Sequence, residues 1–166
     1  EAIEIPVPRT IFLHLDSRDR RILSDYKKPK EGDRFLKELK SAIEIVGLPA
    51  FLRTEGHSDK HNWKDTCFIE KTDENYLLKH LFKLAEFSEC ADIERGDPYD
   101  FWMVRQMIPT EKVFTAFNEM PIVSEIRYFV RNGMIECSHH YWPEEVFEKE
   151  NNPDYKKLIE IPKTEL

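Results

Sequence analysis

Long apolar runs are absent from this sequence, and glycine and cysteine are scarce in it. No stretch approaches 18 consecutive apolar residues, so the sequence offers no candidate for a membrane-spanning helix. Five glycines among 166 residues exclude a collagen-like repeat. The three cysteines, Cys67, Cys90 and Cys137, lie far apart and form no CxxC pair. We therefore expect reduced thiols and a cytoplasmic protein without a membrane partner.

Basic residues are also fewer than acidic ones. Lys and Arg number 25 against 32 Asp and Glu, which gives a formal net charge of −7. A nucleic-acid binder depends on a cationic surface, so nucleic acid is not expected as a partner, whereas a local cationic pocket remains compatible with this balance. Hydrophobic residues make up 40% and aromatic residues 12% of the chain, which suits one ordinary domain or two very small ones and excludes a disordered chain.

Apolar periodicity divides the first half of the chain into strands and helices. Asp33 and Gly47 are suited to begin and end a helix, because Asp caps the first amides and Gly adopts the left-handed conformation. We expect strands at residues 10–15, 49–53 and 66–70, helices over 33–47 and 73–87, and solvated charged loops over 16–31 and 54–64.

The second half of the chain is aromatic and β-branched, which is typical of strands. Asn132-Gly133 is a strong signal for a two-residue hairpin turn. We expect strands at residues 101–109, 113–117, 123–131 and 134–138, followed by a polar tail over 143–166. Helices and strands in this order predict an α+β fold.

The segment 123–131 is the first candidate for a functional site. Alternation along a strand places Glu125 and Arg127 on one face and Ile126 and Tyr128 on the other. Arg127 on a cleft floor would hold a phosphate or carboxylate through its planar fork. A solvated strand face with a surface ion pair explains the same pattern, so periodicity alone leaves both interpretations open.

The loop from Arg53 to Lys64 is the second candidate. It carries Lys60 and Lys64 together with Gly56. Cations and backbone N–H groups in such a loop can fold over a polyphosphate. A charged surface loop is the alternative, although the large aromatic ring of Trp63 indicates that the loop packs on something.

Histidine and cysteine suggest a zinc site as a further possibility. His57 and His61 are four residues apart, and Cys137 lies close to His139 and His140. The histidine pair lacks the glutamate of the HExxH motif, and the second group matches no closed zinc module. Structural roles therefore fit these residues better than a zinc-dependent hydrolase does.

The strand at 101–109 places Arg105 and Gln106 within an otherwise apolar run. A core strand is the simplest interpretation of that run. Where the strand leaves the core at Ile108 and Pro109, its backbone N–H and C=O groups would be able to meet the edge of an adenine base.

Several segments occur in an order that resembles the ATP-grasp family, in particular its small members from bacteriophages and bacteria. The resemblance covers residues 49–142, over half of the chain, and it rests on the order and spacing of short motifs rather than on a single one. The motifs are PAFLRT at 49–54, SDKH at 58–61, WKDTC at 63–67, WMVRQMIP at 102–109, TAF at 115–117, MPI at 120–122, EIRYFV at 125–130, Asn132-Gly133 and Tyr141-Trp142.

This resemblance implies an ATP-grasp-like fold, in which two small α+β subdomains with antiparallel sheets enclose a nucleotide cleft. Arg53 stands where the family has a phosphate-binding lysine, and Lys60 lies in the loop that covers the phosphates. The backbone that reads adenine in the family corresponds to Gln106, Met107 and Ile108. The implied cofactors are ATP and Mg²⁺, which bridges phosphates.

The resemblance also implies an activity. Glu125 and Arg127 match the acidic-x-Arg strand of the larger subdomain, whose arginine faces phosphate or substrate. Family members use ATP to activate a carboxylate as an acylphosphate, which an amine then attacks. The expected function is an ATP-dependent carboxylate–amine ligase with small-molecule or peptide carboxylate and amine substrates, and the alternative is a non-catalytic nucleotide- or protein-binding module on the same fold.

The expected organisation has three parts. Residues 1–48 hold an N-terminal strand, a charged loop and a helix, residues 49–108 form the smaller subdomain, and residues 109–166 begin the larger subdomain and end in the polar tail. The family's magnesium ligands follow the segment that Tyr141-Trp142 matches, and the chain begins at Glu1 rather than at Met. We therefore expect a fragment of the enzyme and assign no metal ligands.

Overall fold

The structure is a computed structural model that describes residues 7–29, 33–95, 100–143 and 146. The chain divides into two compact units, Glu1–Ile108 and Pro109–Leu166, each of which is treated by itself. Every pair of neighbouring strands is antiparallel, and helices accompany the strands of the first unit. The predicted α+β class with small antiparallel sheets is therefore confirmed.

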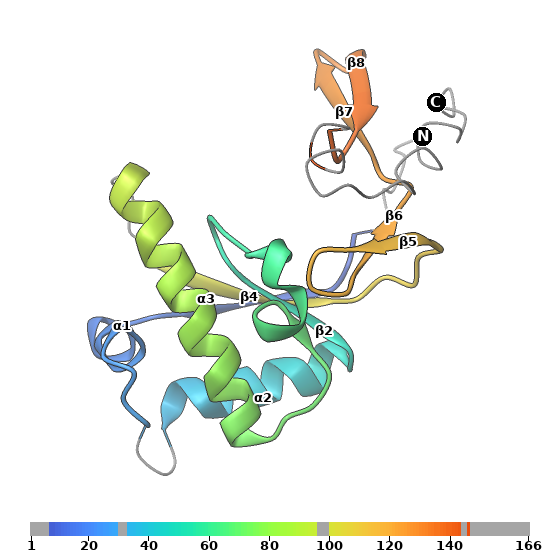
Figure 1. Ribbon diagram of the computed structural model, residues 1–166. Coiled ribbons are helices and arrows are strands. Elements are labelled where there is room, and N and C mark those ends of the chain that lie inside the picture. The colour runs from blue at the N-terminus through green and yellow to red at the C-terminus, as the bar shows by residue number, and fades with distance from the viewer. Residues whose placement is uncertain (1–6, 30–32, 96–99, 144–145, 147–166) are drawn as a thin grey trace. The chain divides into compact units, whose positions relative to one another are not determined.

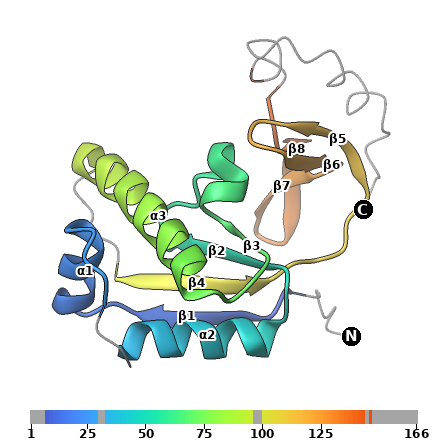
Figure 2. The ribbon, with the colours of Figure 1, turned by 60° about the horizontal axis from the view of Figure 1, so that its bottom comes forward.

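The first unit is built on one four-stranded sheet. Its strands are β1 (Thr10–His14), β2 (Ala50–Thr54), β3 (Phe68–Ile69) and β4 (Phe101–Gln106). Figure 2 shows them side by side in the order β1-β4-β2-β3. The strand from the segment 1–48 thus pairs with one from the segment 49–108, so both segments share a single sheet.

Helices α2 (Arg34–Val46) and α3 (Glu74–Arg95) pack against one face of this sheet, and α1 (Ser17–Ser24) packs beside α3 (Figure 1). The helix predicted over 33–47 is confirmed as α2, with Asp33 as its N-cap and Gly47 as its C-cap. The core between helices and sheet includes Leu39, Ile43, Leu52, Leu77, Leu81, Leu84, Trp102 and Val104.

The helix α1 replaces part of the loop predicted over 16–31, so that prediction was wrong. Asp16 caps the helix through the amides of Arg18 and Asp19, and the side chain of Asp19 accepts in return from the amide of Asp16. This reciprocal capping stabilises a short polar helix. Among its apolar side chains only Leu23 is buried, which is too weak a periodic signal to reveal a helix.

Two other boundaries also differ from the prediction. The loop predicted over 54–64 contains a short 3₁₀ segment, η1 (Lys60–Asp65). The helix predicted over 73–87 continues to Arg95 as α3, through a polar stretch that lacks an apolar period.

The second unit consists of two hairpins in separate sheets. β5 (Lys112–Ala116) pairs with β6 (Met120–Val123), and β7 (Ile126–Arg131) pairs with β8 (Met134–His140). The predicted turn at Asn132-Gly133 is confirmed, because both residues have positive φ angles, 51° and 78°, as a tight hairpin turn requires.

The single strand predicted over 123–131 was wrong. The chain leaves one sheet at Val123 and enters another at Ile126, so Ser124 and Glu125 form a link between two strands. Each of the two strands pairs with its own hairpin partner, and a continuous β-branched sequence does not reveal such a change of partner.

In the parts of the chain that the structure describes, the helices are either too short or too polar to cross a lipid bilayer.

The packing of α2 predicts a contrast between two apolar side chains of the same helix. Leu39 is 0% exposed in the core, whereas Ile45 is 51% exposed. Leu39→Ala should lower the free energy of unfolding by about 2–5 kcal/mol, because it leaves a cavity among buried side chains. Ile45→Ala, measured beside it by urea denaturation, should change that free energy by about 0.5 kcal/mol or less. Equal losses in the two variants would contradict the assignment of the buried helix face.

Candidate functional site

The candidate site begins with the sheet face opposite α2 and α3. Trp102 and Val104 of β4 are fully buried beneath the helices, so the alternate residues of that strand lie on the opposite face. Strand pairing places their neighbours from β1 and β2 on the same face. We call this surface the open face, and it comprises Thr10, Phe12, His14, Phe51, Arg53, Phe101, Met103 and Arg105.

The open face combines two cations with the exposed rings of Phe12 and Phe101, whereas its third phenylalanine is buried against Trp63. Arg53 lies directly across from Met103, and Phe51 lies across from Arg105, so the two arginines flank the centre of the face diagonally. Arg105 donates from Nε to the hydroxyl of Thr10 at 3.3 Å. Guanidinium groups on a surface with aromatic rings suit a planar base and its phosphates.

Arg53 is bonded to the loop that follows its own strand. Its Nε donates to the carbonyl of Thr54 at 2.8 Å, and Nη2 donates to the carbonyl of Glu55 at 2.9 Å. Beneath the sheet, the hydroxyls of Thr54 and Ser88 lie 3.2 Å apart and are buried, which attaches the start of the loop to α3. The guanidinium is thus placed at the point where strand and loop meet.

The loop that carries Lys60 and Lys64 folds around a buried carboxylate. Asp59 has a left-handed backbone conformation, and its carboxylate accepts from the side-chain amide of Asn62 at 2.9 and 3.1 Å. The hydroxyl of Thr66 donates to the carbonyl of Asp59 at 2.9 Å. Burial raises the pKa of the Asp59 carboxyl. These bonds hold η1 in one conformation.

The indole of Trp63 fixes the same loop on the sheet. It stacks on Phe68 with ring centroids 5.1 Å apart and lies 5.9 Å from the ring of Phe51. Trp63 is buried, as the sequence indicated for a large aromatic ring in a polar loop. Lys60 and Lys64, on either side of it, therefore belong to a loop that packs on the sheet at the β3 end of the open face.

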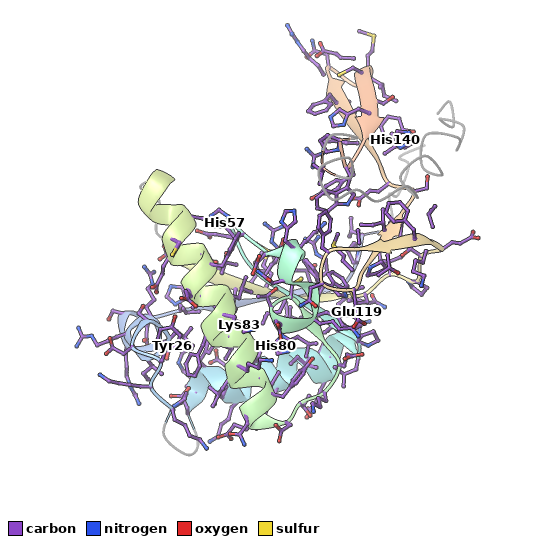
Figure 3. The ribbon with its side chains drawn as sticks, in the orientation of Figure 1. Tyr26, His57, His80, Lys83, Glu119 and His140 are labelled. Atoms are coloured by element: carbon purple, nitrogen blue, oxygen red, sulfur yellow. The ribbon has the colours of Figure 1, made fainter. Side chains whose placement is uncertain are left out.

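α3 supports the end of the loop through charged and polar contacts, and Figure 3 labels two of the residues involved, His80 and Lys83. Lys79 and Lys83 both bind the carboxylate of Asp65, at 2.7 and 2.9 Å. These two bonds lower the pKa of Asp65 to about 2. His80 lies between the two lysines in the sequence and donates from Nδ1 to the carbonyl of Thr66 at 3.0 Å. No local sequence pattern points to these supporting residues, because they act from a distant helix.

Three of the predicted site residues lie where the first unit ends. The amide of Gln106 donates to the carbonyl of Arg9 at 2.8 Å, and the side-chain oxygen of Gln106 accepts from the amide of Arg9. Gln106 is therefore engaged within the sheet. Met107 and Ile108 follow β4, and the boundary of the unit comes immediately after Ile108.

Glu125 and Arg127 belong to the second unit. The carbonyl of Glu125 accepts from the amide of Tyr141 at 2.8 Å, and the guanidinium of Arg127 lies over the Tyr141 ring at 4.6 Å from its centre. Tyr141 thus fixes both residues, although Glu125 precedes β7 rather than lying within a strand. The structure brings Arg53, Lys60 and Lys64 together in one unit and Glu125 with Arg127 in the other.

The zinc interpretation finds no geometric support. Across the described ranges, no group of three His, Cys, Asp or Glu side chains is arranged to hold a metal ion. His57 instead packs edge-on against Phe87, and His139 makes a 2.6 Å contact with the carbonyl of His140. Burial raises the pKa of the Cys67 thiol to about 12, which makes that cysteine a poor nucleophile.

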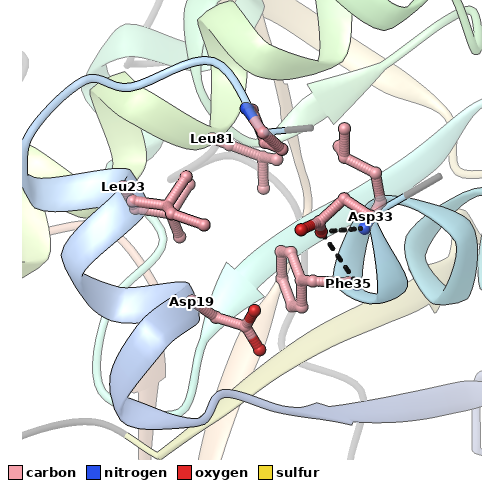
Figure 4. A pocket seen from close by; sticks show the side chains of 8 residues that line it. Asp19, Leu23, Asp33, Phe35 and Leu81 are labelled. Carbon is pink, nitrogen blue, oxygen red and sulfur yellow. Dashed lines mark hydrogen bonds between the residues drawn. The ribbon is translucent and has the colours of Figure 1, made fainter. Parts of the chain in front are cut away.

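A small pocket lies apart from the open face, between α1, α2 and α3 (Figure 4). Its lining includes Leu23, Phe35 and Leu81, together with the carboxylates of Asp19 and Asp33. Asp33 is engaged in capping α2, and Asp19 pairs with Arg34. The cavity of about 10 Å³ has room for roughly one water molecule, so it is no site for a nucleotide.

Comparison with family models, with curated proteins and with solved structures gave no match for this chain.

The support of the loop by α3 predicts a pH dependence of stability. His80 is 1% exposed, and burial lowers its pKa below the ordinary value of 6.5. The folded state therefore holds this imidazole neutral while the unfolded chain protonates it. The contribution of His80 to stability is fully present above pH 6.5 and should be lost as the pH decreases below that value. The free energy of unfolding, measured by urea denaturation across this range, should show the fall.

The variant His80→Gln tests the origin of this dependence. It keeps a donor for the Thr66 carbonyl and removes the titrating ring, so the loss of stability below pH 6.5 should become smaller. His14→Gln, which changes an exposed histidine, is the matched control and should leave the profile of the wild type in place. A pH profile of stability that is unchanged in His80→Gln would contradict the assignment of this pH dependence to His80.

Proposed function

We propose that this chain binds ATP on the open face and belongs to an ATP-dependent carboxylate–amine ligase of the ATP-grasp type. The observation that carries the proposal is the placement of two arginines and exposed aromatic rings on one sheet face, beside a fixed loop with two lysines. Arg53 stands where the resemblance implies a phosphate-binding residue, and Lys60 lies in the loop implied to cover the phosphates. Lys64 is a further cation of that loop. The fixed loop supports this role, because binding then costs little ordering of the protein.

The residues present fit the chemistry of a nucleotide. Three cations would donate charge-assisted hydrogen bonds to phosphate oxygens: the guanidinium of Arg53 and the ammonium groups of Lys60 and Lys64. The backbone of Met107 and Ile108 would meet the adenine edge, while Gln106 keeps β4 paired with the chain before β1. The base and the phosphates would thus be bound at opposite ends of the strands of one sheet.

The residues that would bind Mg²⁺ are considered separately from the nucleotide ligands. Within the described part of the chain, no cluster of acidic side chains is arranged to bind a metal ion. Mg²⁺ in nucleotide sites is held largely by the phosphates and by one or two carboxylates. We therefore assign no residue of this chain to Mg²⁺.

The proposed reaction joins a carboxylate to an amine in two steps. The carboxylate oxygen attacks the γ-phosphorus of ATP, the bond to the bridging oxygen breaks, and ADP leaves with that electron pair. The amine then attacks the acyl carbon and displaces inorganic phosphate. Arg127, oriented by the Tyr141 ring, would hold a transferring phosphate or the carboxylate, and Glu125 would lie beside it.

Nucleotide binding is the first test of the proposal. Titration calorimetry of Mg-ATP into the chain should detect binding in the wild type, and Arg53→Ala or Lys60→Ala should raise the dissociation constant by about tenfold or more, since each removes a charge-assisted hydrogen bond. Arg18→Ala removes an exposed cation of α1 and serves as the control. Equal affinities in wild type, Arg53→Ala and Lys60→Ala would contradict the site.

Turnover is the second test. A panel of carboxylates with hydroxylamine as a general amine should release ADP from Mg-ATP in a carboxylate-dependent manner. Arg127→Ala should lower that rate by about 100-fold or more, because the arginine is proposed to act on the reacting groups. Arg131→Ala removes another cation of β7, paired with Glu136, and should leave the rate near that of the wild type. ATP binding without turnover would instead favour the non-catalytic binding module or the expected fragment of the enzyme.

A further inference from the structure

The outer edge of β1 is the feature from which a partner can be inferred. β1 ends the sheet on one side, and among the described strands only β4 pairs with it. At the other end of the sheet, β3 has two residues and is adjoined by η1. β1 therefore presents the longer exposed edge, and an unpaired edge is a template for another strand.

The hydrogen bonds at both ends of β1 show which backbone groups point outward. The carbonyl of Arg9 accepts from the amide of Gln106, and the amide of Leu15 donates to the carbonyl of Asp100. Bonding groups alternate along an antiparallel strand, so the odd-numbered residues face β4. The N–H and C=O groups of Thr10, Phe12 and His14 point to the outer edge.

This edge lacks the devices that usually prevent strand association. Between Thr10 and His14 there is no proline, lysine or acidic residue. At the centre of the strand the side chain of Phe12 is 61% exposed. Just before the strand begins, the guanidinium of Arg9 donates to the carbonyl of Ile45. Ile45, whose apolar side chain is also exposed, therefore lies close to Arg9.

We propose that β1 pairs with β1 of a second copy of this chain, antiparallel and with the two-fold axis at Phe12. Two antiparallel strands can pair only residues that share a face, and only outward-pointing groups can bond. An axis at Phe12 satisfies both conditions, since it joins Phe12 to Phe12 of the second copy and Thr10 to its His14. The strand is thus self-complementary, as a two-fold interface requires.

Pairing about this axis also fixes how the sheets of the two copies lie. The result is one sheet that continues from copy to copy, with both open faces on the same side. This proposal is independent of nucleotide binding.

Sedimentation equilibrium of the full chain over roughly 1–100 µM tests the interface. The wild type should dimerise. Phe12→Lys places like charges on the axis and should raise the dimer dissociation constant by about tenfold or more. Phe12→Pro removes an outward amide without removing a bond to β4, and should also dissociate the dimer. Phe12→Leu keeps an apolar side chain and the amide, and should still dimerise.

Circular dichroism melting separates dissociation from misfolding. If Phe12→Pro fails to fold, Phe12→Lys decides, because it changes no backbone group. A wild type that stays monomeric throughout this range overturns the proposal, and so does a dimer that persists in a folded Phe12→Lys variant. Dimerisation in the wild type and Phe12→Leu, with its loss in the folded Phe12→Lys variant, supports it.

Discussion

The alternation of side chains along β4 is the constraint on which the first unit depends. Trp102 and Val104 must be buried against the helices, and this fixes Met103 and Arg105 on the opposite face. A shift of one residue in register would expose the indole and bury the guanidinium. The hydrophobic effect on one side of the sheet therefore places the polar and cationic groups on the other. The candidate site is a consequence of core packing.

The loop beside the open face depends on a second set of contacts. Trp63 packs on the sheet, the carboxylate of Asp65 binds two lysines of α3, and His80 of the same helix donates to the loop backbone. α3 therefore joins the core to the candidate phosphate loop. Preorganisation of this kind places cations for binding, since a loop that is already ordered loses little entropy when a ligand arrives.

Much of the secondary structure could be predicted from the sequence. The helix capped by Asp33 has a clear apolar period, and the turn at Asn132-Gly133 needs residues that accept positive φ angles. Both signals are local. The α1 helix has one buried apolar residue, Leu23, and depends on reciprocal capping bonds, so its signal was too weak. The break before β7 depends on a change of pairing partner, which a local pattern does not contain.

The candidate site was less predictable, for a similar reason. Arg53 and the lysines of its loop are conspicuous because they are close in sequence. Arg105 joins Arg53 on the open face only through strand pairing, across about fifty residues of chain. Lys79, His80 and Lys83 reach the loop from a helix whose apolar period does not indicate such contacts. Contacts between distant segments supply this part of the site.

Amide chemical shifts of the isotope-labelled chain during titration with Mg-ATP would show directly whether a nucleotide binds on the open face. We expect changes concentrated in the strand residues of the open face and in the loop from Arg53 to Asp65, with the buried residues of α2 unaffected. GTP, added in the same way, serves as the comparison for base selectivity. Changes confined to the helices, or no saturable change at all, would contradict the placement of a nucleotide on this sheet.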